Sequence, residues 1–216
     1  MWNFENLDKH LFPGVGAYHI PRILPVKEPP QGPFLPINTH YSEKHPEGKN
    51  LHFFVEDTCF IRLWNAPGRY IPRLSQYRAV LAPDFSLYTD MPMAMQIYNH
   101  YRKHWLAAYW QLHGITVYPT ISWSTPESYA WCFDGEPVGG IVAVSSVGTR
   151  KSREGRRLFL QGYEEMMKRL SPAGIIFYGG VPEGCGGDIF PVAPYYETVR
   201  EWKRQADACK NPGGVG

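Results

Sequence analysis

The feature that most constrains the fold of this chain is a repeated order of short apolar runs and helical segments after residue 50. Strands are expected over residues 51–57, 79–82, 115–121, 140–145, 175–178 and 188–192, and helices over 91–113, 126–133, 152–170 and 195–209. The strand runs are continuous and rich in β-branched residues, as in strands covered on both faces. Their alternation with helices predicts an α/β fold with a mainly parallel sheet built from βα units.

Right-handed crossovers between parallel strands allow two ways of arranging such units. One is a barrel-like, partial TIM-type sheet, and the other is an open doubly wound sheet. We favour the barrel-like form, because every expected strand is followed by a polar corner at what must be the same edge of the sheet.

The first fifty residues differ from the rest because they contain eight prolines. Proline fixes φ and removes a backbone donor, so a regular helix or a central strand is not expected there. Apolar residues that can anchor this segment are Phe12, Ile20, Ile23, Leu24 and Phe34. The sequence therefore predicts a Pro-rich N-terminal arm over residues 1–50, packed on a single α/β domain over residues 51–216.

Charge and cysteine content narrow the function classes. With 22 basic and 20 acidic residues the net charge is +2, which argues against a nucleic-acid coat protein but leaves a local basic groove open. The four cysteines lie far apart, so neither a zinc ribbon nor an iron–sulfur site is indicated. The sequence has no secretory signal, and none of its apolar runs approaches the length of roughly 20 residues that a membrane span needs. We therefore expect a cytoplasmic protein without membrane contact.

Polar residues gather at the carboxyl ends of the expected strands, where ligands bind in both architectures. The densest corner lies in residues 78–92, between a buried strand and the longest helix. The candidate site residues at the corners are Asp57, Asp84, Ser86, Asp90, Ser122, Trp123, Ser145, Arg150 and Tyr178. If the strands are parallel, these side chains converge on one face of the molecule.

Asp84 and Asp57 are the candidate catalytic residues. A carboxyl group at the exit of a buried strand can serve as general acid or base, or bind a divalent metal through oxygen. The alternative for Asp84, which follows Pro83, is a plain turn residue. The alternative for Asp90 is an N-cap of the helix that follows it.

Two further segments carry weaker indications. Residues 145–153 combine hydroxyls, a glycine and cations before a helix, as a phosphate-binding loop does, but the Walker ending is missing and we favour a solvated basic turn. His100 and His104 form an i, i+4 pair that could bind a metal, but no third ligand is nearby in the sequence. The sequence points to no particular cofactor, and a metal requirement stays open.

The central stretch also carries a resemblance. The motifs are residues 83–92 (PDFSLYTDMP), 96–99 (QIYN), 109–111 (YWQ), Gly114 with Ile115, Pro119, Ser122 with Trp123, and Tyr178 with Gly179. In this order they resemble a family of phage and mobile-element proteins catalogued as domain of unknown function 4417, over roughly residues 51–194. The resemblance implies a bacterial host cytoplasm and a mobile genetic context, and it brings no established activity.

Two hypotheses follow for the function. In the first, the chain is an enzyme acting on a nucleotide or nucleic-acid-derived substrate. Ser86, Ser122 and Tyr178 would orient the substrate, Trp123 would stack on it, and Arg150 would meet an anion. In the second, the chain is a non-catalytic module that binds DNA or a protein in replication or counter-defence; the sequence does not identify a protein partner. Acids converging in a pocket would favour the enzyme, whereas a basic groove without a buried acid would favour the binding module.

Overall fold

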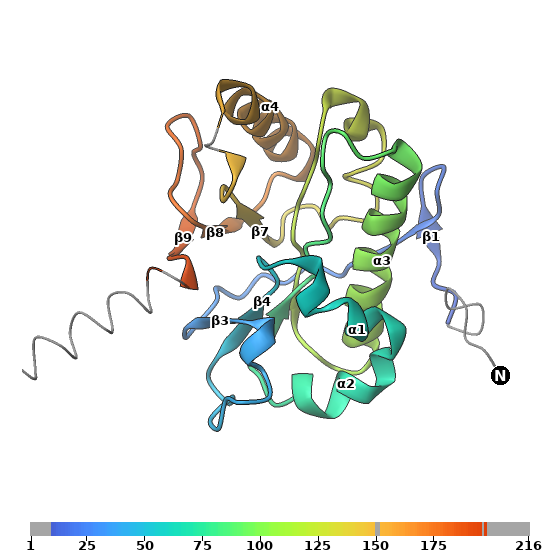
Figure 1. Ribbon diagram of the computed structural model, residues 1–216, viewed down its shortest axis with the longest axis vertical. Coiled ribbons are helices and arrows are strands. Elements are labelled where there is room, and N and C mark those ends of the chain that lie inside the picture. The colour runs from blue at the N-terminus through green and yellow to red at the C-terminus, as the bar shows by residue number, and fades with distance from the viewer. Residues whose placement is uncertain (1–9, 150–151, 196, 198–216) are drawn as a thin grey trace, which may run out of the picture.

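Within each sheet, the parallel strands are arranged side by side in the same order as in the sequence (Figure 1). The structure is a computed structural model that describes residues 10–149, 152–195 and 197. One sheet contains, in this order, β3 (Phe34–Pro36), β4 (Asn50–His52), β5 (Ala79–Leu81) and β6 (Val117–Tyr118). The other contains β7 (Ile141–Ser145), β8 (Gly174–Tyr178) and β9 (Ile189–Val192). A parallel bridge between Thr120 and Ala143 connects the two sheets just beyond β6.

The predicted α/β class with a mainly parallel sheet is confirmed, because every pairing in both sheets is parallel. A strand order that equals the chain order is the winding of a barrel, whereas a doubly wound sheet reverses its order part-way. The rings of His52, in β4, and Tyr178, in β8, lie 4.6 Å apart, so the two sheets curve toward each other. Among the described residues no pairing joins β3 to β9, and the barrel is not closed.

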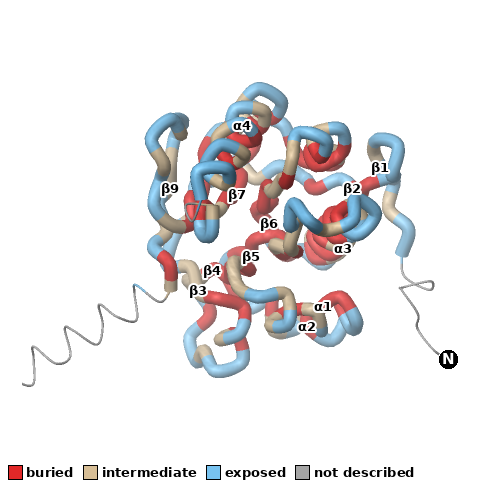
Figure 2. The backbone as a smooth tube through the Cα atoms, turned by 45° about the horizontal axis from the view of Figure 1, so that its top comes forward, coloured by how far each residue is buried: buried red, intermediate tan, exposed pale blue. Residues whose placement is uncertain are grey.

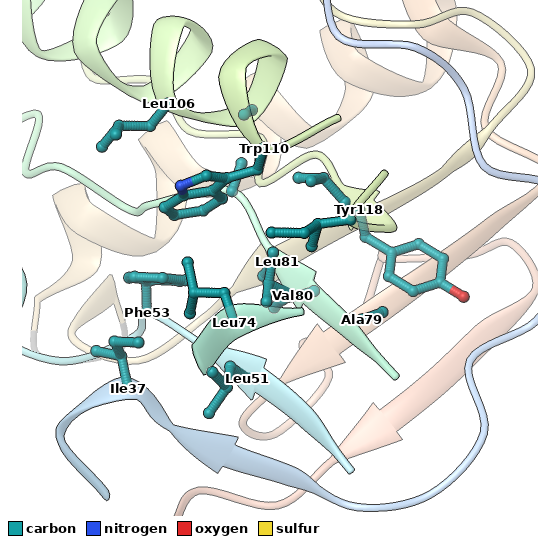
Figure 3. Close-up of a cluster of buried hydrophobic side chains, with 14 of the residues drawn as sticks. Ile37, Leu51, Phe53, Leu74, Ala79, Val80, Leu81, Leu106, Trp110 and Tyr118 are labelled. Atoms are coloured by element: carbon teal, nitrogen blue, oxygen red, sulfur yellow. The ribbon is translucent and has the colours of Figure 1, made fainter. Parts of the chain in front are cut away.

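Helices cover the outer faces of both sheets. The α-helices are α1 (Ile61–Asn65), α2 (Pro67–Leu74), α3 (Met93–Leu112) and α4 (Arg153–Leu170), and the short 3₁₀ helices are η1 (Ile37–Thr39), η2 (Asp57–Cys59) and η3 (Pro126–Ala130). A first core contains residues of α1, α2 and α3 together with the four-stranded sheet, and a second lies between α4 and the three-stranded sheet. In Figure 3, Leu106 and Trp110 of α3 lie over Val80 and Leu81 of β5.

The sequence of α4 explains both its ends and its buried face. Ser152 caps the N-terminus, because its Oγ accepts a hydrogen bond of 2.9 Å from Gly155 N. The buried positions Phe159, Gly162, Tyr163, Met166 and Leu170 recur at helical spacing and face the three-stranded sheet. Apart from Gly162, burying side chains of this size contributes about 1.5–3 kcal/mol each.

The proline-rich arm contributes an edge strand and a small hairpin. β1 (Gly14–Val15) pairs antiparallel with β2 (Ile20–Pro21), and β3 lies at the edge of the four-stranded sheet, where proline is tolerated. Figure 2 shows the change from the exposed β1 turn to the buried β2. Of the expected anchors, Ile20 and Ile23 are buried and Leu24 is exposed. The division at residue 50 stays a prediction.

One predicted cap is wrong, one predicted helix is shorter than expected, and another is not described. The long helix begins at Met93 after Pro92, so Asp90 is not its N-cap, and no side chain caps it. The helix expected over residues 126–133 is a 3₁₀ turn over residues 126–130, and Thr125 before it makes no capping bond. The helix expected over 195–209 lies almost entirely outside the described residues. Gly114 does follow the C-cap of α3, with φ +77°.

Candidate functional site

A cleft of about 630 Å³ lies at the carboxyl ends of β4, β5, β6 and β7, beside the start of α4. Its lining comes from the segments that follow these strands, namely residues 54–56, 84–89, 121–124 and 145–149, together with Gly155, Leu158 and Phe159 of α4. These are corners of the kind at which α/β proteins bind ligands. A volume of this size holds a small metabolite or a mononucleotide.

Asp84 lines this cleft three residues after the end of β5. The preceding residues 79–83 are all buried, and Asp84 itself is half-buried. Burial raises the pKa of the Asp84 carboxyl to about 7; the charge of Lys103 lowers it and that of Asp57 raises it. A carboxyl group that titrates near neutral pH can both take up and release a proton.

Asp57 holds the loop that carries Asp84. Its carboxylate accepts hydrogen bonds from Ser86 N at 3.3 Å and from Ser86 Oγ at 3.0 Å. Asp57 opens the 3₁₀ turn η2 after β4, so the bonds tie the corner of β4 to the corner of β5. Asp57 is not among the described residues that line the cleft, although its neighbour Glu56 is. Its observed contacts therefore position the loop at the cleft.

Polar residues on α3 make hydrogen bonds to the segments that follow β5 and β6. Asn99 Nδ2 donates to the Ser86 carbonyl at 2.7 Å, and Ser124 Oγ donates to Gln96 Oε1 at 2.5 Å. Lys103 Nζ donates to the Thr120 carbonyl at 2.8 Å. All three α3 residues are buried, and their amide and ammonium groups contact the segments that follow β5 and β6. These bonds connect α3 to two of the corners that line the cleft.

Lys103 also belongs to a buried ionic group. Its ammonium donates to Glu136 Oε1 at 2.7 Å, and His104 Nε2 lies 2.9 Å from the same oxygen. Burial would raise the pKa of Glu136, but Lys103 and His104 lower it below its ordinary value. The carboxylate of Glu136 is therefore ionised at neutral pH, unlike that of Asp84.

The other predicted site residues are placed in different ways. Ser86, Ser122, Trp123 and Ser145 line the cleft together with Asp84. Asp90 is exposed and Tyr178 is buried beside His52 and Phe54, and neither is among the described lining residues. Arg150 lies outside the described residues.

Trp123 is fixed in the cleft wall by α4. Its indole N–H donates to the Leu158 carbonyl at 3.2 Å, and its ring lies against Phe159 at 5.5 Å. A Cβ at Gly162 would lie 2.1 Å from the indole nitrogen, so the glycine is what lets the ring approach the helix. One edge of the indole is thus already used in packing.

Sequence reasoning missed Lys103, Glu136, Gln96 and Asn99 as parts of the site. On α3, Tyr98 is at the surface, whereas the buried face includes His100, Lys103 and His104. Lysine is almost never fully buried unless it is paired. Its partner is 33 positions away, in a turn, so no local spacing could reveal the pair. Two further residues of α3, Arg102 and Gln111, contact the Phe85 ring and the backbone of Leu24 respectively.

Comparison with known proteins places the chain in a family. The family described as "Domain of unknown function (DUF4417)" matches residues 12–196. The chain belongs to this family. It is 39% identical to the Gene 1 protein of Mycobacterium phage L5 over 88% of this chain and 85% of the relative. It is 38% identical to the Gene 1 protein of Mycobacterium phage D29, over 90% of this chain and 72% of the relative. The comparison with solved structures gives no match.

These findings confirm the resemblance seen in the sequence, and the match also extends into the proline-rich arm, to residue 12. The DUF4417 description names no activity, and neither do the names of the two phage relatives. In the part of the chain that the structure describes, no helix combines the length and the apolar character that crossing a membrane requires.

Proposed function

We propose that this DUF4417 protein is an enzyme that acts on a nucleotide or nucleic-acid-derived substrate, with Asp84 as general acid or base. The substrate would lie in the cleft at the carboxyl ends of β4 to β7. Its setting would be the cytoplasm of a bacterial host and a mobile genetic element, which the phage origin of the relatives supports.

The observation that carries the proposal is the state of Asp84 within the cleft. General acids and bases work best when their pKa lies near the operating pH. Asp84 meets this condition with a pKa of about 7, and it lines the cleft together with Ser86, Ser122 and Ser145. A perturbed acid in a concave site is a candidate catalytic group on physical grounds. The presence of Asp84, a half-buried acid, in the cleft lining also favours an enzyme over a binding module.

The lining of the cleft supports the substrate class. Phe54, Phe85 and Trp123 give it aromatic walls on which a base can pack. Gly148, Thr149 and Gly155 also line the cleft, beside the start of α4, where the helix dipole and the backbone N–H groups of the first turn favour an anion such as phosphate. Aromatic walls for a base and a helix N-terminus for a phosphate fit the two parts of a nucleotide.

One observation favours the second function, a non-catalytic module that binds DNA or a protein. Arg153 and Arg156 are exposed on the first turns of α4, close to the cleft rim formed by Gly155. Exposed arginines of this kind contact phosphates in a way that weakens with added salt. Under this alternative, replacing both arginines by Ala would weaken DNA binding and flatten its salt dependence, and Asp84→Asn would leave binding unchanged.

The test is a turnover assay with a matched pair of variants. The wild-type chain is incubated with ribo- and deoxyribonucleoside mono-, di- and triphosphates and with single-stranded DNA, and products are separated by ion-exchange chromatography. We expect Asp84→Asn to lower turnover at least about 100-fold, because it removes the proton-transferring group. Asp90→Asn changes an exposed carboxylate in the same segment, outside the described lining, and should leave the rate within about twofold.

Two results would contradict the enzyme. The first is a folded wild-type chain that neither binds nor converts any member of the panel. The second is an Asp84→Asn variant as active as Asp90→Asn. A loss of activity that comes with a large loss of melting temperature would assign Asp84 a structural role instead.

A further inference from the structure

A second polar group lies away from the cleft lining, where α3, β2 and the turn at residues 134–136 meet. His100, His104 and Glu136 each offer one ligand atom there, and these atoms lie within 4.8 Å of one another. The two histidine residues are 1% and 0% exposed, and the Glu136 side chain is 0% exposed. Three such groups with no contact with water need partners that satisfy every polar atom.

The proton count at His104 does not close with protein groups alone. Its Nδ1 lies 2.8 Å from the Pro21 carbonyl oxygen, and its Nε2 lies 2.9 Å from Glu136 Oε1. Both of these atoms are acceptors, whereas a neutral imidazole carries a single N–H. A second proton would create an imidazolium beside the Lys103 ammonium, with one carboxylate to balance two buried cations.

Two other atoms of the group are buried without any hydrogen-bond partner. They are Nδ1 of His100 and Oε2 of Glu136. An orphaned buried acceptor costs about 1–3 kcal/mol, so two in one cluster call for a common partner. A cation in contact with Nδ1, Oε2 and the lone pair of His104 Nε2 would satisfy all three.

The remaining contacts orient the imidazoles as metal sites usually do. His100 Nε2 lies 3.1 Å from the Asp134 carbonyl oxygen, and His104 Nδ1 lies 2.8 Å from the Pro21 carbonyl oxygen. A ligating histidine almost always donates its other ring N–H to a carbonyl or carboxylate, which fixes the tautomer and the ring direction. Lys103 Nζ, bonded to Oε1, plays the same outer role for the Glu136 carboxylate.

We propose that His100, His104 and Glu136 bind a divalent transition-metal ion of the Zn²⁺ class. Two imidazole nitrogens and one carboxylate are a ligand set that Zn²⁺ accepts in tetrahedral coordination, with one position left for a further ligand. The Glu136 carboxylate shared with Lys103 makes binding weaker than in a site with three free ligands. This assignment does not rest on the proposed enzymatic function, because none of the three residues is among the described residues lining the cleft.

Such an ion would join two parts of the chain, α3 and the turn after η3, and would fix His104 against the arm. Pro21 belongs to β2 of the arm, His100 and His104 to the middle of α3, and Glu136 to the turn after η3. Gly135 closes the site tightly: a Cβ there would lie 2.9 Å from His104 Nδ1 and 2.5 Å from the Pro21 carbonyl oxygen. Metal binding would therefore stabilise the docking of the arm on α3.

The test uses the untagged full chain and the metal alone. After treatment with a chelator and dialysis against Zn²⁺, elemental analysis should find about one Zn²⁺ per chain. At a free Zn²⁺ concentration about 100 times Kd, the melting temperature should rise by roughly 5–10 °C. Co²⁺ in place of Zn²⁺ should give visible d–d absorption typical of nitrogen and oxygen ligands.

Two variants locate the ion. His100→Gln should abolish the Co²⁺ spectrum and the Zn²⁺-dependent rise in melting temperature. His113→Gln is the matched control, because His113 is an exposed residue next to the C-terminal end of the same helix and its Nδ1 already faces the Tyr109 carbonyl. His113→Gln should keep both the Co²⁺ spectrum and the Zn²⁺-dependent rise in melting temperature. If His100→Gln does not fold, the measurements on the wild-type chain decide.

Three results would overturn the proposal. One is a folded wild-type chain that takes up less than about a tenth of an equivalent of Zn²⁺ or Co²⁺. Another is metal uptake that is unchanged in His100→Gln. The third is a ¹⁵N NMR spectrum of wild-type protein in the presence of Zn²⁺ that shows His104 doubly protonated, because the second proton would then occupy the metal position.

Discussion

Asp84 and Glu136 are two carboxyl groups whose pKa values are both lowered by the charge of Lys103, yet their net shifts from the ordinary values have opposite signs. Glu136 accepts a hydrogen bond from Lys103 Nζ at 2.7 Å and contacts His104 at 2.9 Å, and its pKa lies below the ordinary value. Asp84 feels the charge of Lys103 but has no ion pair within 4.0 Å among the described residues, and burial raises its pKa to about 7.

The difference shows that direct pairing, more than burial, decides what a buried acid can do. A paired carboxylate stays ionised and holds structure, because its desolvation is offset by contact with a cation. An acid that feels the cation only at a distance changes protonation near neutral pH, which is the property that proton transfer requires. Asp84 in the cleft is the acid without a direct partner, and Glu136, beside Lys103 and His104, is the paired one.

The largest effect should come from Lys103→Met, which removes the cation common to both regions. Glu136 would be left ionised, buried and without its closest partner, which costs about 3–5 kcal/mol of unfolding free energy. Chemical denaturation measures the loss. Lys168→Met is the control, because Lys168 is largely exposed, with Glu165 3.8 Å away, and should change stability little. A loss below about 1 kcal/mol for Lys103→Met would contradict the pairing account.

A smaller effect is expected from Asp84→Asn on the dependence of stability on pH. A carboxyl whose pKa is raised in the folded state contributes stability that is fully present below its unfolded pKa, near 4. That stability is lost as the pH rises through the folded value of about 7. Above pH 7 the variant should thus be more stable than wild type by about 2 kcal/mol; this figure halves the full conversion because Asp84 is half-buried.

Denaturation curves of Asp84→Asn and wild type between about pH 4 and 8 check this prediction, and the two should converge toward the acid end. Asp90→Asn, run in parallel, should follow wild type throughout. Equal stability of Asp84→Asn and wild type across the range would mean that Asp84 is ionised like a surface carboxylate.

The smallest effect concerns Asp57→Asn. The charge of Asp57 raises the pKa of Asp84, so its removal should move the Asp84 titration to lower pH. The side-chain amide keeps one acceptor for Ser86, so we expect the stability to fall by only about 1 kcal/mol. An NMR titration of Asp84 in the variant measures the shift. An Asp84 pKa that stays in place or rises would show that Asp57 does not act on Asp84 through its charge.

The fold class was accessible from the sequence because its strands are continuous apolar runs. The runs at 141–145 and 174–178 are buried along almost their whole length, so their composition alone marks them as covered on both faces. β3 was not predicted, because a three-residue edge strand flanked by prolines has no periodicity to detect. The N-cap prediction for Asp90 failed because the helix begins only at Met93, with Pro92 at the N-cap position and no side-chain cap.

The site was accessible only in part. The rule that ligands meet the carboxyl ends of parallel strands picked out Asp84, Ser122 and Ser145, which line one cleft, although their roles stay a proposal. The charge environment was not accessible, because Lys103 and Glu136 are 33 positions apart and meet only through the packing of α3 against a turn. A sequence shows which acids stand at strand ends, but the pKa of each depends on such distant partners.

The most direct test of the contrast between the two acids is a ¹³C NMR titration of the side-chain carboxyl groups, with Asp84→Asn and Glu136→Gln used to assign the two resonances. The account predicts that Asp84 titrates with a pKa of about 7, whereas Glu136 stays ionised to below its ordinary range. A midpoint for Asp84 near 4, the value of an ordinary aspartate, or a Glu136 that takes up a proton near neutral pH would contradict it.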